Sequence, residues 1–285
     1  MQWAFLDGRF IPKMEKAIAL EERGLTFGDG LFEVLRTING KILFFNDHLN
    51  RMKESAAFFG YAFPWPLPQI EQWALELIKR NQIQNGELYI QLTRGEDQNR
   101  EHRYPPRESL STFFMLALPL RKINAALWEQ GAKVIPYPDL RHGLCVHKTI
   151  NLLANVIAKN HAYRYRGYEA LMYRTDPLGS IITEGGSSSY FGVSDLGVVT
   201  PKIDNILPGI TRKKVIGILT HMHIPVIERK VLLSEYLSMK EVFLVSTVSK
   251  VMPIHSIGNR SFDAPGPITL QIQKEYEQIF LAELS

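Results

Sequence analysis

"TFGDGLFEVLRTINGKILFFNDHLNRM", residues 26–52, decides the fold class that we expect for this chain. The stretch reads as a glycine turn, a strand over 31–38, a hairpin turn at 39–40, a second strand and then a helix. Asn-Gly between two β-prone runs favours a two-residue hairpin, because both residues tolerate positive φ. The helix is expected to begin near Asn46 or Asp47, either of which can cap it. Strands that alternate with helices in this way indicate an α+β fold.

The remaining chain repeats this mixture in two series of elements. In the first series, a helix over 68–81 and a strand over 87–94 precede a polar loop that begins at Gly95, and a strand over 111–120 follows it. The second series consists of short strands, a helix after Lys148 and two later helices. The sequence therefore predicts a small domain at 1–119, a linker at 120–126 and a larger domain at 127–285.

Composition indicates an ordinary soluble enzyme. The chain has 285 residues, of which 45% are hydrophobic and 22% are charged, and its net charge is +4. Because basic and acidic residues are interleaved, we expect no nucleic-acid partner. No apolar run is long enough for a membrane helix, and the N-terminus lacks a signal peptide. Cys145 is the single cysteine, which fits a reduced, cytoplasmic setting.

A lysine stands at the edge of an apolar run in "CVHKTINLLANVIAKN", residues 145–160. Thr149 is a good helix N-cap. Apolar residues then recur at helical spacing on one face of the expected helix, namely Leu152, Leu153, Val156 and Ile157. The pattern predicts that Lys148 lies just before the helix, at the rim of the core.

Arg141 and His147 are close to Lys148 in the sequence. Neighbouring positive charge or desolvation lowers the pKa of an amine toward the range in which it is a nucleophile. Lys148 is therefore a candidate for Schiff-base chemistry.

Motifs along nearly the whole chain, from about residue 3 to 280, occur in the order seen in the class IV, or fold-type IV, pyridoxal-phosphate aminotransferases. These motifs are "RGLTFGDGLFEVLR", "NDHLNRM", "YIQLTRG", "HKTINLLANVIAKNHA", "YEALMYR", "ITEGGSSSYFGV", "ILPGITRKKVI" and "VFLVSTVS". The chain most closely resembles the bacterial D-amino acid (D-alanine) transaminases. The resemblance implies a small α/β domain, a larger domain with a β-barrel-like core and flanking helices, and pyridoxal 5'-phosphate bound between them.

The resemblance also implies roles for individual residues. Lys148 would carry the cofactor as a Schiff base and later move a proton, while Glu184 would keep the pyridine nitrogen protonated, so that the ring accepts electrons. Leu207 would pack on the ring, and Arg141 would lie near the Schiff base. The residues implied in binding the phosphate or the rest of the cofactor are Arg51, Ile210, Thr211, Ser246 and Thr247. For Thr211 there is an independent reason, because exposed amides at a helix start bind anions.

The loop after "QLTRG" carries Arg100 and His102, whose spacing matches the substrate-carboxylate trap of the D-amino acid transaminases. An arginine suits a carboxylate because its planar fork donates two parallel hydrogen bonds. In that family the loop reaches in from the partner subunit, so the resemblance implies a homodimer. The implied reaction is a ping-pong transfer from an amino acid such as D-alanine to a 2-oxo acid such as 2-oxoglutarate.

Phe32 departs from the family pattern, since the D-alanine enzymes typically have a tyrosine there whose hydroxyl completes the trap. Alternation along the strand puts Phe32, Val34 and Arg36 on one face. We hypothesise that Arg36 supplies the missing donor.

Three other functions remain open. A branched-chain L-amino acid transaminase and 4-amino-4-deoxychorismate lyase use the same fold, lysine and cofactor, and a non-catalytic binding protein would keep the fold, with or without the cofactor. Lys148, Glu184 and Arg51 argue against the last of these. We expect no metal site, because the pair His221 and His223 has no evident third ligand.

Replacing Arg36 with leucine tests the hypothesis for this residue. Loss of a charge-assisted hydrogen bond to the substrate carboxylate should raise the KM for the amino donor by about tenfold or more. Steady-state kinetics with a series of donor concentrations measures the effect, and an unchanged KM would sink the idea.

Overall fold

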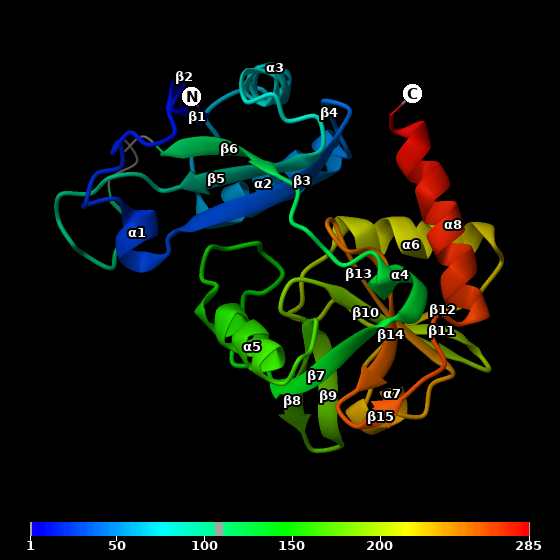
Figure 1. Cartoon of the computed structure of the whole chain (residues 1–285). Helices are drawn as coiled ribbons and strands as arrows, with labels where there is room; N and C mark the ends of the chain where they lie inside the picture. The colour runs from blue at the N-terminus through cyan, green and yellow to red at the C-terminus, as the bar shows by residue number, and fades with distance from the viewer. Residues whose placement is uncertain (1, 106–110, 285) are drawn as a thin grey trace. The chain divides into compact units, whose positions relative to one another are not determined.

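The computed structural model describes residues 2–105 and 111–284. It divides into two compact units, whose elements are labelled in Figure 1. Unit 1 consists of Met1–Arg121, His147–Asn151 and Glu283–Ser285, and unit 2 consists of Lys122–Val146 and Leu152–Ala282. The domain limits inferred from the sequence, at 1–119, 120–126 and 127–285, stay a prediction.

Unit 1 is built on an antiparallel sheet. Its strands follow the order β2-β1-β6-β5-β3-β4 in the described part of the chain. The bounds of its elements are β1 Trp3–Leu6, β2 Arg9–Pro12, α1 Arg23–Phe27, β3 Gly30–Ile38, β4 Lys41–Ile42, α2 Phe45–Phe59, α3 Leu67–Arg80, β5 Gly86–Thr93 and β6 Phe113–Pro119. The predicted loop after Gly95 is described only as far as Pro105, since residues 106–110 lie outside the described residues.

The core of unit 1 lies against one face of this sheet. Leu31 and Leu35 of β3 are almost fully buried and pack with Leu49 of α2 and Leu77 of α3. Alternate residues of β3 explain this arrangement, because positions 31, 33, 35 and 37 are buried while 32, 34 and 36 are half-buried. The predicted grouping of Phe32 with Arg36 on the other face is therefore confirmed.

The hairpin predicted from Asn-Gly is confirmed. Asn39 has φ 50° and Gly40 has φ 76°, and β3 pairs with β4 across them. The helix that follows begins at Phe45, after an N-cap at Phe44 that makes no side-chain cap bond. The expectation that Asn46 or Asp47 caps this helix was therefore wrong, because both residues already lie within its first turn.

The segment around Lys148 pairs with the edge of β3. The N–H of Phe32 donates to the carbonyl of Lys148 at 3.0 Å, and the N–H of Ile150 donates to the carbonyl of Gly30 at 3.0 Å. Leu31 and Thr149 form an antiparallel bridge. Thr149 was expected to cap a helix, and that expectation was wrong, because its backbone is extended beside β3.

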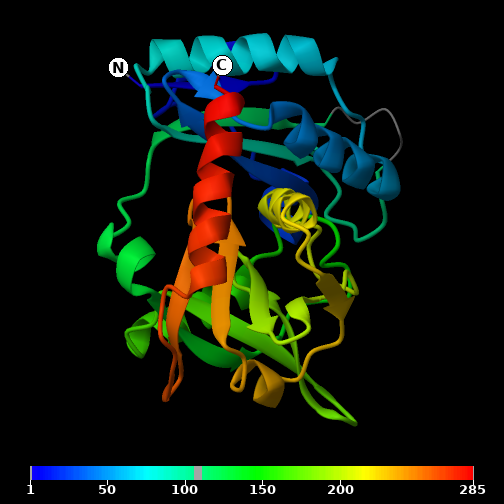
Figure 2. The same cartoon turned by 90° about the vertical axis from the view of Figure 1, so that its right-hand side faces the viewer.

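Unit 2 contains a longer, mixed sheet. Its strands follow the order β12-β11-β10-β13-β14-β7-β8-β9, with β15 paired to β14, in the residues that the structure describes. The bounds are α4 Ala126–Gln130, β7 Ala132–Pro138, α5 Leu153–Arg164, β8 Glu169–Asp176, β9 Gly179–Gly185, β10 Ser189–Ser194, β11 Gly197–Pro201, α6 Ile210–His221, β12 Val226–Arg229, α7 Leu233–Tyr236, β13 Glu241–Ser246, β14 Lys250–Ile257, β15 Arg260–Ser261 and α8 Pro267–Ala282. Helix α8 runs along β13 and β14 beside α6 (Figure 2).

Helix α5 packs on β7 and β8 through two small residues. Ala158 and Ala162 are buried against Ile135 and Met172. The predicted apolar face is turned the other way, since Leu153 is 74% exposed and Val156 is 59% exposed. The expectation that this face covers the core was wrong, because small side chains let the opposite face of the helix approach the sheet.

Within residues 2–105 and 111–284, no helix is long and apolar enough to cross a membrane.

Candidate active site

Lys148 is held against β3 within unit 1. Its carbonyl accepts the N–H of Phe32, and its Nζ lies 4.2 Å from the centroid of the Phe32 ring. An ammonium over an aromatic face is attracted by the ring quadrupole. Backbone pairing and this ring contact together fix where the amine points relative to the half-buried face of β3.

The residue before the lysine is anchored on α2. The Nδ1 of His147 lies 3.1 Å from the hydroxyl of Ser55, and its ring stacks on Phe58 at 4.2 Å between centroids. Burial lowers the pKa of His147. The ring packs as an anchor for the segment that carries Lys148, and the lowered pKa expected for the Lys148 amine stays a prediction.

Arg51 belongs to a buried ionic group on the core face of β3. Its Nε and NH2 donate to the two oxygens of Glu33 at 2.8 and 2.7 Å, and the Nδ1 of His48 lies 2.6 Å from the same carboxylate. Burial by itself raises the pKa of Glu33, but the charges of Arg51 and His48 outweigh it and lower the pKa to about 2. The group orients the arginine that the sequence predicted as a phosphate ligand.

Asp29 helps to hold the loop that begins at Gly95 beside α1. Its carboxylate accepts from the Nε of Arg23 at 2.9 Å, from the Nε of Arg94 at 2.8 Å and from the hydroxyl of Tyr61 at 2.7 Å. Burial raises the pKa of Asp29, but these donors reverse the effect and lower it. Arg23 also donates to the carbonyl of Glu101 at 2.8 Å. The loop is therefore held to α1 by a charged clamp.

Arg100 and His102 lie on this loop and share one aromatic neighbour. The guanidinium carbon of Arg100 is 5.1 Å from the centroid of Phe27, and the ring of His102 is 5.3 Å from it. Both side chains are otherwise exposed. The structure thus brings together the two residues that the sequence predicted to bind a carboxylate.

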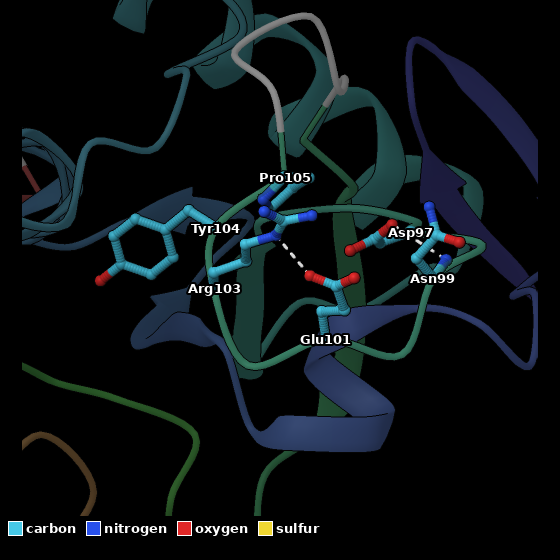
Figure 3. A pocket seen from close by; sticks show the side chains of 6 residues that line it. All are labelled: Asp97, Asn99, Glu101, Arg103, Tyr104 and Pro105. Atoms are coloured by element: carbon cyan, nitrogen blue, oxygen red, sulfur yellow. Dashed lines mark hydrogen bonds and ion pairs between the residues drawn. The ribbon is translucent and has the colours of Figure 1, made fainter.

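The same loop encloses a small pocket, drawn in Figure 3. Its lining residues are Asp97, Asn99, Glu101, Arg103, Tyr104 and Pro105. Arg103 forms an ion pair with Glu101, and the lining carries two carboxylates. The two carboxylates outnumber the single arginine, so the negative lining makes the pocket a poor site for an anionic substrate.

Glu184 is a buried carboxylate of unit 2, near the end of β9. It accepts hydrogen bonds from the NH1 of Arg141 and, at 3.1 Å, from the backbone N–H of Leu207. Both of these donors bond Oε1. Burial raises the pKa of Glu184, and Arg141 opposes this effect. Oε2 accepts from neither of these two donors.

Arg141 is itself oriented by Asp139, just after β7. Its Nε and NH2 donate to the two oxygens of Asp139 at 2.9 and 2.7 Å. Arg174 of β8 pairs with the same carboxylate at 3.1 Å. Bidentate pairing of this kind fixes a guanidinium in one plane.

The start of α6 presents backbone amides of a kind that suits an anion in unit 2. The N-cap is Gly209, which has extended backbone and no side-chain cap, so the first amides of the helix have no intrahelical partner. A Cβ on Gly209 would lie 3.1 Å from the hydroxyl of Ser189, which shows how closely this turn approaches β10. Thr211 lies in the first turn.

Ser246 ends β13, and Thr247 follows it. The hydroxyl of Ser246 accepts the N–H of Ser249 at 3.0 Å. The neighbouring strand brings Ser189 opposite Val245, so the end of β13 and the start of α6 both approach the first residue of β10. The residues that the sequence predicted around the phosphate in unit 2 are thus grouped.

The residues present fit pyridoxal 5'-phosphate. Unit 2 supplies a carboxylate with one oxygen turned from its two protein donors, which suits a protonated ring nitrogen, and a helix start that suits a phosphate. Unit 1 supplies a lysine whose backbone is fixed by a strand.

Sequence reasoning did not single out Asp139, Asp29 or Glu33. For Glu33 a signal was present, because a carboxylate on the buried face of a strand requires a partner. Asp139 and Asp29 gave no such signal, since each stands next to a turn where an exposed aspartate is common.

Comparisons with known proteins cover nearly the whole chain. The sequence profile of amino-transferase class IV matches residues 30–257. The D-alanine aminotransferase of Staphylococcus epidermidis is 33% identical over 281 residues, which cover 98% of this chain and 98% of the relative.

Solved structures share the architecture at lower identity. The branched-chain amino acid aminotransferase of Escherichia coli has a TM-score of 0.90 at 21% identity, covering 99% of this chain and 95% of the other. The 4-amino-4-deoxychorismate lyase of Pseudomonas aeruginosa has a TM-score of 0.83 at 23% identity, covering 96% and 98%.

Replacing Glu33 with glutamine should destabilise the protein by about 3–5 kcal/mol at pH 7, because Arg51 then stays buried without its counter-ion. The pKa of Glu33 is lowered from its ordinary 4.5 to about 2, so its contribution is complete above pH 4.5 and is lost as the pH falls toward 2. The difference in the free energy of unfolding between Glu33→Gln and wild type should therefore become smaller as the pH falls from 4.5 toward 2.

Denaturant unfolding at several pH values measures this difference. Arg80→Met is the matched control, since Arg80 pairs with Glu76 on an exposed helix face and its loss should cost less than about 1 kcal/mol. A Glu33→Gln difference that stays constant down to pH 2 would contradict the assignment.

Proposed function

This chain belongs to the class IV aminotransferases, and from that membership we propose that it moves the amino group of D-alanine, or of a similar D-amino acid, to a 2-oxo acid such as 2-oxoglutarate. The observation that carries the choice of donor is the 33% identity to a D-alanine aminotransferase over nearly the full length of both chains. The predicted α+β, fold-type IV architecture is confirmed by the likeness to solved structures of that fold.

Pyridoxal phosphate, when bound, supplies an electron sink for the bonds at the α-carbon of the amino acid. In this proposal the Nζ of Lys148 is the covalent anchor of the cofactor and, once released, moves the proton at the α-carbon. Glu184 accepts a hydrogen bond from the protonated ring nitrogen. The start of α6, with Ile210 and Thr211, binds the phosphate together with Arg51, Ser246 and Thr247.

The carboxylate of the substrate is bound by Arg100 and His102 in this proposal. Support comes from their shared position on Phe27 and from the clamp that holds their loop. Phe32, which lies beside the lysine amine, has no hydroxyl to offer a carboxylate. We keep Arg36, on the same face of β3, as the candidate for that additional donor.

Branched-chain L-amino acid transamination and 4-amino-4-deoxychorismate cleavage are the alternatives. A branched-chain aminotransferase and a 4-amino-4-deoxychorismate lyase share this fold at 21% and 23% identity, which is a likeness of fold alone. Phe32 is the observation that keeps these alternatives in view, because it removes a hydroxyl expected for D-alanine binding.

Visible absorption of the protein loaded with pyridoxal phosphate tests which amino acid donates its amino group. Addition of D-alanine should convert the absorbance of the lysine-bound cofactor to that of the aminated cofactor, whereas L-alanine and L-leucine should leave it unchanged. Lys148→Ala should abolish the lysine-bound absorbance and reduce turnover by at least about a thousandfold, since covalent and acid–base roles are lost together.

A conversion seen with L-leucine instead would move the assignment to a branched-chain transaminase. If none of the three amino acids changes the spectrum of a loaded protein, transamination of D-alanine is excluded, and the assignment moves to the lyase or to another amino donor.

We also propose a homodimer in which α5 lies at the interface. Its outer face exposes Leu153, Val156 and Ile157, and such an apolar strip on a helix indicates an interaction surface. A second copy of the chain is the occupant that the family resemblance implies. A cytoplasmic location stays a prediction.

Subunit complementation tests whether Arg100 acts on a partner's site. Lys148→Ala and Arg100→Ala chains are each expected to be nearly inactive. Co-expressed with different tags, they should regain on the order of a quarter of wild-type activity, because half of randomly formed dimers are hybrid and one of their two sites has both residues.

Co-expression of two Lys148→Ala chains is the control. Activity that equals only the sum of the two parent variants would show that the loop serves its own subunit. Val156→Glu, which places a charge on the outer face of α5, should reduce the dimer fraction in sedimentation.

A further inference from the structure

Four charged side chains form a compact cluster across three neighbouring strands of unit 2. They are Asp139 after β7, Arg141 in the following segment, Arg174 of β8 and Glu184 of β9. The side chains of Asp139, Arg141 and Glu184 are 0%, 7% and 6% exposed. Two carboxylates and two guanidinium groups make the cluster neutral overall, which is the condition for burying so many charges together.

The donors of Arg141 are divided unequally between its two carboxylates. Nε and NH2 both bond Asp139, while NH1 bonds Glu184. The backbone adds to this division, since the N–H of Arg141 donates to Asp139 Oδ1 at 3.1 Å. Asp139 thus holds the plane of the guanidinium group, and Glu184 receives one donor from its edge.

A guanidinium group that is not held in this way pairs with a carboxylate through two parallel hydrogen bonds. Without Asp139, Arg141 would be expected to turn its fork onto Glu184, whose pairing would then occupy both oxygens. A carboxylate engaged in this way is a weaker acceptor for any third, cationic donor.

We propose that Asp139 is a positioning residue for cofactor binding. By binding two nitrogens of Arg141, it limits this arginine to one donor on Glu184 and leaves Oε2 of Glu184 for the ring nitrogen of pyridoxal phosphate. The inference rests on the proposed function, because it takes that cofactor as the partner of Glu184.

Arg174 and Leu207 fit this role for Asp139. Arg174 binds Asp139 from the side at 3.1 Å and so keeps the carboxylate in place when Arg141 uses both of its oxygens. The N–H of Leu207 adds a second donor to Oε1 of Glu184, the oxygen that Arg141 already occupies. In the described residues, both hydrogen bonds that Glu184 accepts therefore converge on one oxygen.

The test is a titration of the cofactor-free protein with pyridoxal phosphate, followed by absorbance, in wild type, Asp139→Asn, Arg141→Met and the double variant. Asp139→Asn should raise the dissociation constant about tenfold, the effect of weakening one charge-assisted hydrogen bond. In the Arg141→Met background the same substitution should change the dissociation constant less than about twofold, because the arginine through which Asp139 acts is absent.

Further measurements distinguish a positioning role of Asp139 from a general loss of stability. Asp139→Asn should lower kcat while leaving the KM for D-alanine unchanged, because the ring nitrogen and not the substrate carboxylate is affected. Asp139→Glu, which keeps the charge, should recover part of the cofactor affinity. Asp176→Asn, which removes an exposed pair with Lys230 at the last residue of β8 and touches none of the four clustered side chains, is the control and should bind the cofactor as wild type does.

The results distinguish failure of the positioning role of Asp139 from failure of pyridoxal phosphate as the cofactor. An equal effect of Asp139→Asn with and without Arg141 overturns the inference, and so does wild-type affinity in Asp139→Asn. If wild-type protein itself fails to bind pyridoxal phosphate, the proposed function fails, and the inference fails with it.

Discussion

The pairing of residues 147–151 with β3 is the constraint on which the lysine site depends. Two backbone hydrogen bonds, one to Gly30 and one from Phe32, hold the segment beside the strand and fix the start of the Lys148 side chain. Because the same strand carries Phe32 toward the amine of Lys148 and Glu33 toward Arg51, Lys148 and the ionic core are built on one rigid element. His147 secures the segment from its other side through Ser55 and Phe58.

Buried charge is organised in the same way in both units. In each group a carboxylate holds one or two arginines in a fixed plane: Glu33 holds Arg51, Asp29 holds Arg23 and Arg94, and Asp139 holds Arg141. Such pairs add little net stability, but breaking one is costly, so they specify one geometry. A site for a phosphate and a substrate carboxylate needs cations in defined orientations, and these carboxylates hold arginines in such orientations.

Sequence reasoning succeeded where the signal is local. The Asn39-Gly40 hairpin, the alternation along β3 and the helix that ends before Asn81 follow from backbone preference and side-chain period. It failed where a distant partner overrode the local signal. Thr149 looked like a helix cap but is paired with Leu31, and Val156 looked like a core residue but faces outward because Ala158 and Ala162 pack on the sheet.

By itself the sequence determined the family, the α+β class and the residue types of the site, because ordered motifs and short-range patterns carry that information. Only the tertiary structure decided that Lys148 is held by a strand, that His147 is anchored on Ser55 and Phe58, and that Glu184 receives its donors at one oxygen. The physical reason is that each of these depends on hydrogen bonds between residues far apart in the chain. No local preference of either partner records such a bond.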